Sequence, residues 1–293
     1  MLWSTNAETP FTVGISNYRP LTAMNFRYDL FAGQLSDSDS IAFDGGLTSG
    51  NPCVVGMHLS IEPVSGVSFG ANRIMQYGGG KRGDCHDLDN LFEAFFDPAG
   101  ADNANDELDQ NDEFGNQLAS LTSRINIQTK IPFSVYFEFA GEDTSQFTSH
   151  RLGNTAMQAG LFFPVIDEDI DLTIEYSEWN NTWYVNGIYG DGATNDGNVF
   201  GHYFGDQRGQ GDAVAGKSVY LAAGWQLTRN QLARVELTKL DFADYSIVDY
   251  VTSNVAKLSY SYGFEEYIVS VDVLVGKTAF GENYNRFGLA LRW

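Results

Sequence analysis

The sequence predicts an all-β protein, a transmembrane antiparallel up-and-down β-barrel with a short helix in a loop or plug. Aromatic residues make up 14% of the 293 residues, with 31 Gly and only 7 Pro, a composition typical of strands and turns. Toward the C-terminus, segments of about ten residues alternate apolar and polar side chains, which is the length and pattern of a membrane-spanning strand. The last such segment ends on an aromatic residue, Trp293, a mark of outer-membrane barrels.

About a dozen strands are expected. In chain order, the pattern predicts them at residues 24–34, 54–62, 65–75, 117–129, 132–141, 155–164, 170–179, 182–190, 218–227, 231–242, 254–264, 267–275 and 284–293. The clearest apolar face belongs to the segment 218–227, where it consists of Val219, Leu221, Ala223, Trp225 and Leu227.

Two architectures fit this alternation. In a soluble sandwich or barrel the apolar face points inward, and in a membrane barrel it points to lipid. Strands of about ten residues, longer than the usual five or six of soluble sheets, favour the membrane barrel. The opposite faces carry small and charged residues that suit a watery lumen, so we expect the apolar faces to lie on the outside.

The connections alternate in length. Short turns are expected at 63–66, 130–132 and 264–267, and longer polar links at 34–52, 142–154 and 191–216. This alternation is typical of a barrel with one end toward the periplasm and the other toward the outside.

One segment departs from the β pattern. Apolar residues at 88, 91, 92, 95 and 96 follow helical spacing, with Asp87 before them and Pro98 after them. We expect a short amphipathic helix that covers or plugs one barrel end. The acidic run at 102–113 lacks the spacing of an EF-hand loop, and it is interpreted as a solvated loop.

Charge and cysteine content narrow the function. The net charge is −21, from 38 acidic and 17 basic residues, which argues against nucleic acid as a partner because phosphate binding needs a basic patch. No stretch is long and apolar enough for a spanning helix, and this excludes only the helical route into a membrane. Cys53 and Cys85 permit one disulfide in an oxidising compartment, with two free thiols as the alternative.

No chemistry-bearing motif is complete. The cysteines and the four histidines have no zinc-like spacing, so no metal and no cofactor are expected. A G-x-S-x-G elbow is absent, and Gly78–Arg82 does not match a phosphate loop. The chain is predicted to be no enzyme, with no catalytic residues.

Six stretches carry a resemblance to a known family. In chain order they are Gly70–Gly80, Phe137–Asp143, Gly160–Pro164, Leu172–Tyr176, Trp183–Tyr184 and Gly201–Gly205. Their order and spacing over residues 65–293 resemble those of the Wzi-type capsule assembly family of outer-membrane proteins.

The resemblance implies an eighteen-stranded barrel with extra helices that acts as a lectin of the bacterial outer membrane and has no known catalytic role. The expected partners are capsular polysaccharide and outer-membrane lipid, and the expected state is a monomer. Because about a dozen strands and no signal peptide are visible, residues 1–293 are expected to be a single barrel domain that lacks the family's N-terminal part. A porin-like channel for small solutes is the first alternative, and an outer-membrane enzyme such as a lipase or deacylase is the second.

A lectin needs planar polar groups for sugar hydroxyls and aromatic rings for the apolar sugar faces. Candidates crowd the predicted strand ends and loops: Asn72, Arg73, Arg82, Asp84, Glu142, Asp143, Glu178, Trp179, Trp183, Tyr184 and His202. Each kind has a structural alternative. The tryptophans equally fit the aromatic girdle of a barrel, the charged groups fit structural ion pairs, and His202 fits a loop hydrogen bond.

Overall fold

The computed structural model describes residues 10–85, 111, 113–142, 144–145, 148–167, 169–201, 207–209 and 211–293. The described part is almost entirely strands and turns, with one short 3-10 helix, η1 (Gly80–Arg82). None of its helices has the length and apolarity to cross a membrane. The predicted helix at 88–96 and most of the acidic run at 102–113 lie outside the described residues.

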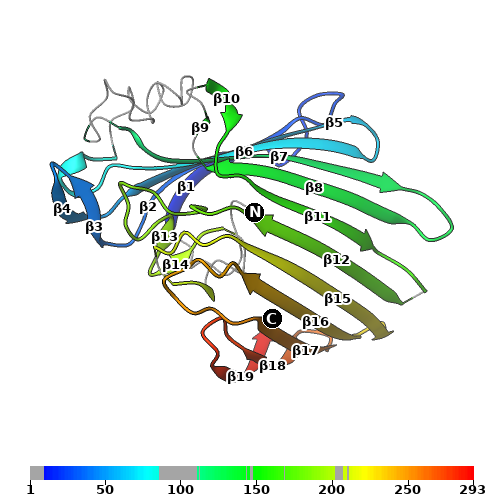
Figure 1. The fold of residues 1–293 in the computed structure, drawn as a ribbon. Coiled ribbons are helices and arrows are strands. Elements are labelled where there is room, and N and C mark those ends of the chain that lie inside the picture. Colours follow the sequence, from blue (N-terminus) through cyan, green and yellow to red (C-terminus); the bar gives the residue numbers. More distant parts are fainter. Residues whose placement is uncertain are drawn as a thin grey trace. The chain divides into compact units, whose positions relative to one another are not determined.

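Thirteen strands form the main sheet, in an order that follows the chain (Figure 1). They are β1 (Phe11–Ser16), β2 (Arg27–Gln34), β5 (Cys53–Val64), β6 (Val67–Tyr77), β7 (Gly115–Ile127), β8 (Phe133–Glu142), β11 (Ala156–Phe163), β12 (Ile170–Trp179), β15 (Gly216–Thr228), β16 (Gln231–Phe242), β17 (Ser253–Gly263), β18 (Ile268–Lys277) and β19 (Asn283–Arg292). Strand neighbours in sequence are neighbours in the sheet, which is the up-and-down topology that the alternation predicts. The all-β prediction with about a dozen strands is confirmed.

Six shorter strands form three two-stranded ribbons in the connections. They are β3 (Ser38–Phe43) with β4 (Gly46–Gly50), β9 (Thr144–Ser145) with β10 (Thr148–Leu152), and β13 (Thr194–Asn195) with β14 (Asn198–Val199). All three lie in segments that the sequence predicts as long polar links. On the other side of the strands the connections are short, for example 65–66, 229–230 and 264–267, so the predicted alternation of loop lengths is confirmed.

The predicted strand at 182–190 is wrong. This segment forms turns, and only one isolated antiparallel bridge, between Ile41 and Tyr189, has β geometry. Thr182 and Tyr184 have φ angles of 65° and 63°, and a left-handed backbone cannot continue a strand. The apolar residues of this segment are buried in a folded loop. A buried loop and a buried strand can have the same composition, and the prediction failed for this reason. The sequence also failed to predict β1 and the three ribbons.

The chain divides into two compact units. The first comprises residues 1–123, 138–157 and 179–215, and the second comprises 124–137, 158–178 and 216–293. That residues 1–293 form one domain stays a prediction.

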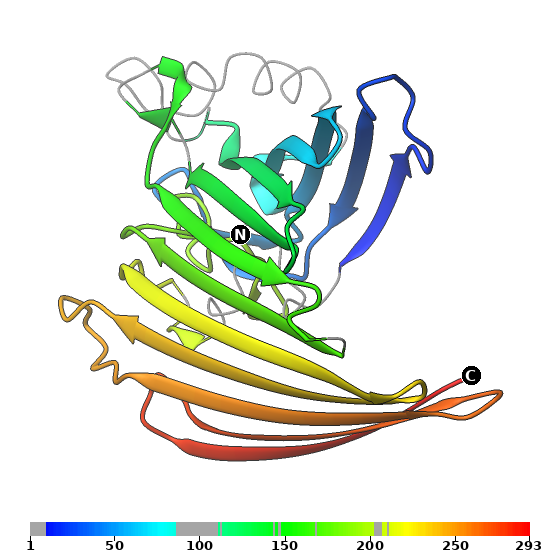
Figure 2. The ribbon, with the colours of Figure 1, turned by 90° about the vertical axis from the view of Figure 1, so that its right-hand side faces the viewer.

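In the second unit, β15 to β19 lie side by side (Figure 2) and have two distinct faces. On one, called the apolar face here, Trp225 and Leu258 are each 55% exposed and Phe287 is 69% exposed. Directly paired residues such as Leu258 and Val273 share this face because opposite residues of antiparallel strands point the same way. Large apolar side chains thus lie exposed on one face of this sheet, as expected for strands in contact with lipid.

The opposite, polar face of the second unit is covered by hydrogen-bonded charged groups. Arg234 on β16 forms an ion pair with Asp171 on β12, with 3.1 Å between Nη1 and Oδ1. Glu236 accepts a hydrogen bond of 2.7 Å from the Tyr220 hydroxyl, and its other oxygen lies 3.4 Å from Lys257 Nζ. Charged groups on this face fit a water-filled side of a barrel and not a dry core.

Candidate functional site

The first unit contains a polar pocket of about 270 Å³. Three parts of the chain line it: residues 36–38 just before and at the start of β3, Pro52 and Gln76 on the sheet side, and the segment 189–197 around β13. The lining consists mainly of hydroxyl, carboxylate, amide and backbone groups. Such groups suit a ligand that presents many hydrogen-bonding hydroxyls.

Hydrogen bonds across a long sequence separation hold the pocket walls together. Ser38 Oγ donates to Asp191 Oδ2 over 2.6 Å, although 153 residues separate them in the chain. The Ser36 backbone N–H donates to Asn195 Oδ1 (2.8 Å), and the Asp196 N–H donates to Ser36 Oγ (2.7 Å). Each link satisfies a backbone or side-chain group that the loops would otherwise leave unpaired.

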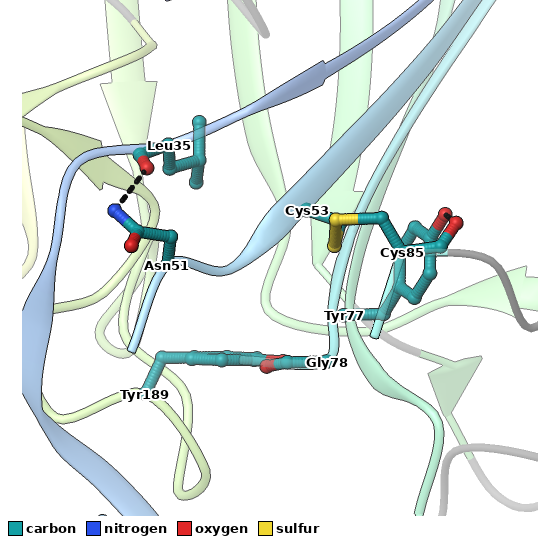
Figure 3. Close-up of a disulfide and its surroundings, with 7 residues drawn as sticks. All are labelled: Leu35, Asn51, Cys53, Tyr77, Gly78, Cys85 and Tyr189. Atoms are coloured by element: carbon teal, nitrogen blue, oxygen red, sulfur yellow. Dashed lines mark hydrogen bonds between the residues drawn. A yellow bond between two sulfur atoms is a disulfide. The ribbon is translucent and has the colours of Figure 1, made fainter. Parts of the chain in front are cut away.

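Below these links lies a small apolar cluster of Ile41, Ile188 and Tyr189, all essentially buried. The Tyr189 hydroxyl donates to the Gly78 carbonyl oxygen over 3.0 Å, which ties the segment 189–197 to the end of β6. Figure 3 shows Tyr189 beside Gly78, near the disulfide. Tyr189 belongs both to this apolar cluster and to the lining of the pocket.

Cys53 and Cys85 form a disulfide, with their Cα atoms 5.5 Å apart (Figure 3). It joins the first residue of β5 to the segment after η1, and the Tyr77 hydroxyl adds a 3.1 Å hydrogen bond to the Cys85 carbonyl oxygen. Of the two alternatives that the sequence left open, the bonded one is therefore found. A structural disulfide is typical of exported proteins.

Gln76 at the end of β6 is the most informative pocket residue. Its side chain is 3% exposed, and its Nε2 donates weakly, over 3.4 Å, to the Gly192 carbonyl oxygen. Within the described residues its Oε1 has no hydrogen-bond partner. A buried unpaired carbonyl is unfavourable by about 1–3 kcal/mol, so a hydrogen bond donated to this oxygen would be stabilising.

Gly192, whose carbonyl oxygen lies beside Gln76, is at a position where only glycine fits. Its φ is 73°, and a Cβ at this position would lie 2.0 Å from the Tyr184 carbonyl oxygen. Any larger residue would therefore displace the backbone beside Gln76.

The pocket has acidic groups but no metal cluster. Asp37 and Asp196 are exposed and Asp191 is half-buried. Among the described residues, no group of three or more His, Cys, Asp or Glu side chains could hold a metal ion. The carboxylate oxygens of these residues can accept hydrogen bonds from hydroxyl or ammonium groups.

Four residues of the sequence-predicted site lie in polar contacts on β6 to β8 and near η1. Asn72 Nδ2 donates to Ser120 Oγ over 2.8 Å, and Arg73 donates to Gln117 Oε1. Arg82 donates to the carbonyl oxygens of Ala42 and Glu113. Glu142 is fully buried and accepts from Asn116 Nδ2 over 2.8 Å.

The aromatic candidates are buried. Trp179, Trp183 and Tyr184 are 4%, 2% and 1% exposed, and the Trp183 and Tyr184 rings meet edge to face with centroids 4.8 Å apart. The Tyr184 ring also lies under the Arg208 guanidinium, with the ring centroid 5.8 Å from Cζ, so the Trp183 and Tyr184 rings pack inside the segment 179–215. Glu178 is exposed and accepts from the Tyr176 hydroxyl over 2.7 Å. Asp84 is exposed beside Cys85, while Asp143 and His202 lie outside the described residues. All eleven stay predicted contacts.

The pocket residues 36–38 and 191–197 were missed. Their Asp, Ser, Thr and Gly composition was visible as polar links, but this composition equally describes solvated loops. The pairing of two links more than 150 residues apart left no signal in the sequence.

The comparisons with known proteins agree with the fold. A family model described as capsule assembly protein Wzi matches residues 1–258. A solved structure of Wzi from Escherichia coli superposes with a TM-score of 0.61 at 16% identity, covering 91% of this chain and 55% of that chain. That E. coli protein is an outer membrane, carbohydrate-binding β-barrel involved in group 1 capsule assembly. This chain thus spans about half the length of the structure that it matches.

Two channels are less similar. CymD, a monoaromatic hydrocarbon channel, matches with a TM-score of 0.44 at 10% identity over 96% of this chain and 80% of its own. DcaP, an outer membrane channel of Acinetobacter baumannii, matches with a TM-score of 0.41 at 10% identity over 97% of this chain and 84% of its own. Likenesses of this size carry no argument about function. No curated protein matches the chain.

Proposed function

The chain belongs to the Wzi capsule assembly protein family and is an outer-membrane β-barrel protein, and on this premise we propose that it binds capsular or other surface polysaccharide and helps to attach or assemble the capsule at the cell surface. The binding is non-catalytic: the polysaccharide is held, not cleaved. Outer-membrane lipid surrounds the strands, and the working unit is a monomer.

One observation carries the proposal, the pocket with the buried Gln76. A sugar hydroxyl is small, neutral and a donor, so it can satisfy Gln76 Oε1, which has no partner within the described residues. The half-buried Asp191 and the exposed Asp37 and Asp196 supply further acceptors around a ring of hydroxyls. We assign one sugar residue of the polysaccharide to this pocket. The predicted contacts Asn72, Arg73, Arg82, Asp84, Glu142, Asp143, Glu178, Trp179, Trp183, Tyr184 and His202 remain candidates for the rest of the chain of sugars.

The test is binding of purified capsular polysaccharide to the detergent-solubilised protein. Gln76→Met keeps the side-chain length and removes both hydrogen-bonding groups, and we expect about tenfold weaker binding because one hydrogen bond to a buried acceptor is lost. Gln226→Met makes the same chemical change on β15 in the second unit, and it should leave the affinity unchanged. Equal affinities of the Gln76 and Gln226 variants would contradict the pocket assignment, and no binding by the wild type would contradict the function.

The same sample tests the absence of catalysis. Polysaccharide recovered after long incubation should keep its chain length and substituents by mass spectrometry. Shortened chains or released acyl groups would instead support an enzyme.

A porin-like channel is the second candidate function, and the polar face of the second unit favours it. Asp171, Arg234, Glu236 and Lys257 present charged groups such as line aqueous pores. Steady open-channel current in a planar bilayer, unaffected by added polysaccharide, would support the channel over the binding protein.

A further inference from the structure

The apolar face of the second unit contains a shallow groove of about 570 Å³. It follows the outer side of β17 and is walled by side chains of β15, β16 and β18. All of these strands belong to one compact unit and lie side by side in Figure 2. The groove and the polar pocket have no lining residue in common and belong to different units, so the groove is a separate candidate site.

The groove exists because a small residue lies between two large ones. Ala256 on β17 pairs directly with Leu237 on β16 and with Val275 on β18. Paired residues of antiparallel strands point to the same face, so the methyl group of Ala256 forms a floor between two larger walls. Leu237 is 47% exposed and Val275 is 50% exposed. An extended hydrocarbon chain fits such a trough.

Two lysines flank the end of the groove. Two residues before Ala256, Asn254 pairs with Lys239 on one side and with Lys277 on the other. Since adjacent strands are about 4.8 Å apart, the two lysine backbones lie about 10 Å from one another, across Asn254. Long, flexible lysine side chains at this spacing can converge on one anionic group between them.

Three lysines, Lys217, Lys239 and Lys277, lie at this end of strands β15, β16 and β18. Lys239 Nζ lies 3.0 Å from Asp241 Oδ2, and Asp241 also accepts a 2.6 Å hydrogen bond from Thr252 Oγ1. Lys217 pairs with Asp241 across the strands, so Asp241 faces two lysines, whereas Lys277 pairs with Asn254 and Asn283. The acids of the adjoining connections are Asp244, Asp249 and Glu282, whereas both strand residues that flank Asn254 at the end of the groove are lysines.

The lysines lie at the end of the strands that carries the longer connections. There β16 and β17 are joined by residues 243–252 and β18 and β19 by 278–282, whereas 229–230 and 264–267 join the strands at the other end. In outer-membrane barrels the longer loops face outward. The lysines are then at the level of the outer-leaflet head groups, with the groove below them in the hydrocarbon.

We propose that this groove binds one phosphorylated, acylated lipid of the outer leaflet. An acyl chain lies over Ala256 between Leu237 and Val275, and a head-group phosphate lies between the ammonium groups of Lys239 and Lys277. The lysines act as point charges on phosphate, and the trough selects lipid over a free anion.

The test titrates the detergent-solubilised full chain with bisphosphorylated lipid A, with native mass spectrometry to count bound lipid. Lys239→Gln/Lys277→Gln should weaken binding about 25-fold, since each lysine near an anionic lipid surface contributes about fivefold. Lys239→Arg/Lys277→Arg should keep the wild-type affinity. Lys81→Gln/Lys130→Gln removes the same charge at two exposed positions elsewhere and should have no effect.

Ala256→Phe separates a lipid from a free anion. It fills the floor and leaves both lysines in place, so it should weaken lipid A binding while inorganic phosphate competes poorly with either protein. The proposal is overturned if the two glutamine double variants bind lipid A equally. It is also overturned if Ala256→Phe has no effect, or if millimolar inorganic phosphate displaces the lipid, because the site would then be a simple anion site.

Discussion

The polar pocket of the first unit and the meander β15 to β19 of the second unit are each stabilised by a different kind of contact. Consecutive strands of the meander pair along nearly their full length, as in Lys257 opposite Glu236 and Leu258 opposite Val235. The pocket walls are held by a few side-chain contacts between distant segments, such as Ser38 with Asp191, and by one disulfide. The meander depends on many local, repeated interactions, and the pocket depends on a few long-range ones.

This difference predicts how the two regions respond to side-chain substitutions. A meander in which each strand is paired with its sequence neighbour tolerates many side-chain changes, provided that the apolar face stays apolar. A pocket built from single contacts is sensitive to each of them, and for that reason it can be specific. Binding residues on loops above a regular scaffold are a common solution to this requirement.

Removing the disulfide should have the largest effect on stability, and this effect should be confined to the first unit. Cys53→Ser/Cys85→Ser opens a loop of 32 residues, and chain entropy predicts a loss of about 3.5 kcal/mol from the opening free energy of the first unit. Hydrogen exchange should accelerate in peptides from 34–85 and stay unchanged in peptides from 231–277. Equal acceleration in both sets would show that the two regions are not independent in stability.

The apolar face of the meander gives the next largest effect. Leu258→Arg should destabilise the folded barrel in lipid by about 3 kcal/mol, because the charge meets hydrocarbon. Ser259→Arg changes the adjacent residue, which points to the polar face opposite Asp272, and should have little effect. Urea unfolding in phospholipid vesicles measures both. A similar penalty for the two variants would contradict the assignment of the faces.

A single link of the pocket has a smaller effect. Ser38→Ala removes the hydrogen bond to the Asp191 carboxylate, and we expect local opening of the segment 186–197 to become easier by about 1.5 kcal/mol. Ser40→Ala is the matched control, because the Ser40 hydroxyl donates at the surface to its neighbour Asp39 and not across the pocket wall within the part of the chain that the structure describes. Hydrogen exchange of this segment should be about tenfold faster in the first variant alone. Unchanged exchange would mean that other contacts hold the wall.

The smallest effect is expected on the polar face of the second unit. The Tyr136 hydroxyl on β8 reaches across Gly160 on β11 and donates to Glu175 on β12 over 2.5 Å; a Cβ on Gly160 would lie 2.3 Å from the ring. Tyr136→Phe should cost about 1 kcal/mol in unfolding free energy, since the many strand pairs remain. A loss as large as that from the disulfide would contradict the view that the stability of the second unit is distributed over many strand pairs.

Sequence reasoning reached the regular parts of the molecule and failed at the irregular ones. Alternation at Val219, Leu221 and Trp225 correctly predicted both the strand and its exposed face because the period of two is a local property. The segment 182–190 is also rich in apolar and aromatic residues. It nevertheless folds into turns, because Thr182 and Tyr184 have left-handed backbone conformations. Nothing local distinguishes an apolar strand from an apolar loop that packs on another loop.

The sequence by itself determined the all-β class, the positions of twelve of the thirteen strands of the main sheet, the alternation of short and long connections and the exposed apolar face of the strands. Each of these follows from neighbouring residues and from the contrast between lipid and water. Tertiary structure alone decided that Ser36 meets Asn195, that Ser38 meets Asp191, and that Gln76 lies buried in the lining of the pocket. It also decided that Cys53 bonds to Cys85 and that Ala256 becomes the floor of a groove. These contacts join residues whose separation along the chain has no fixed relation to their distance in space, so no periodic pattern or motif in the sequence could predict them.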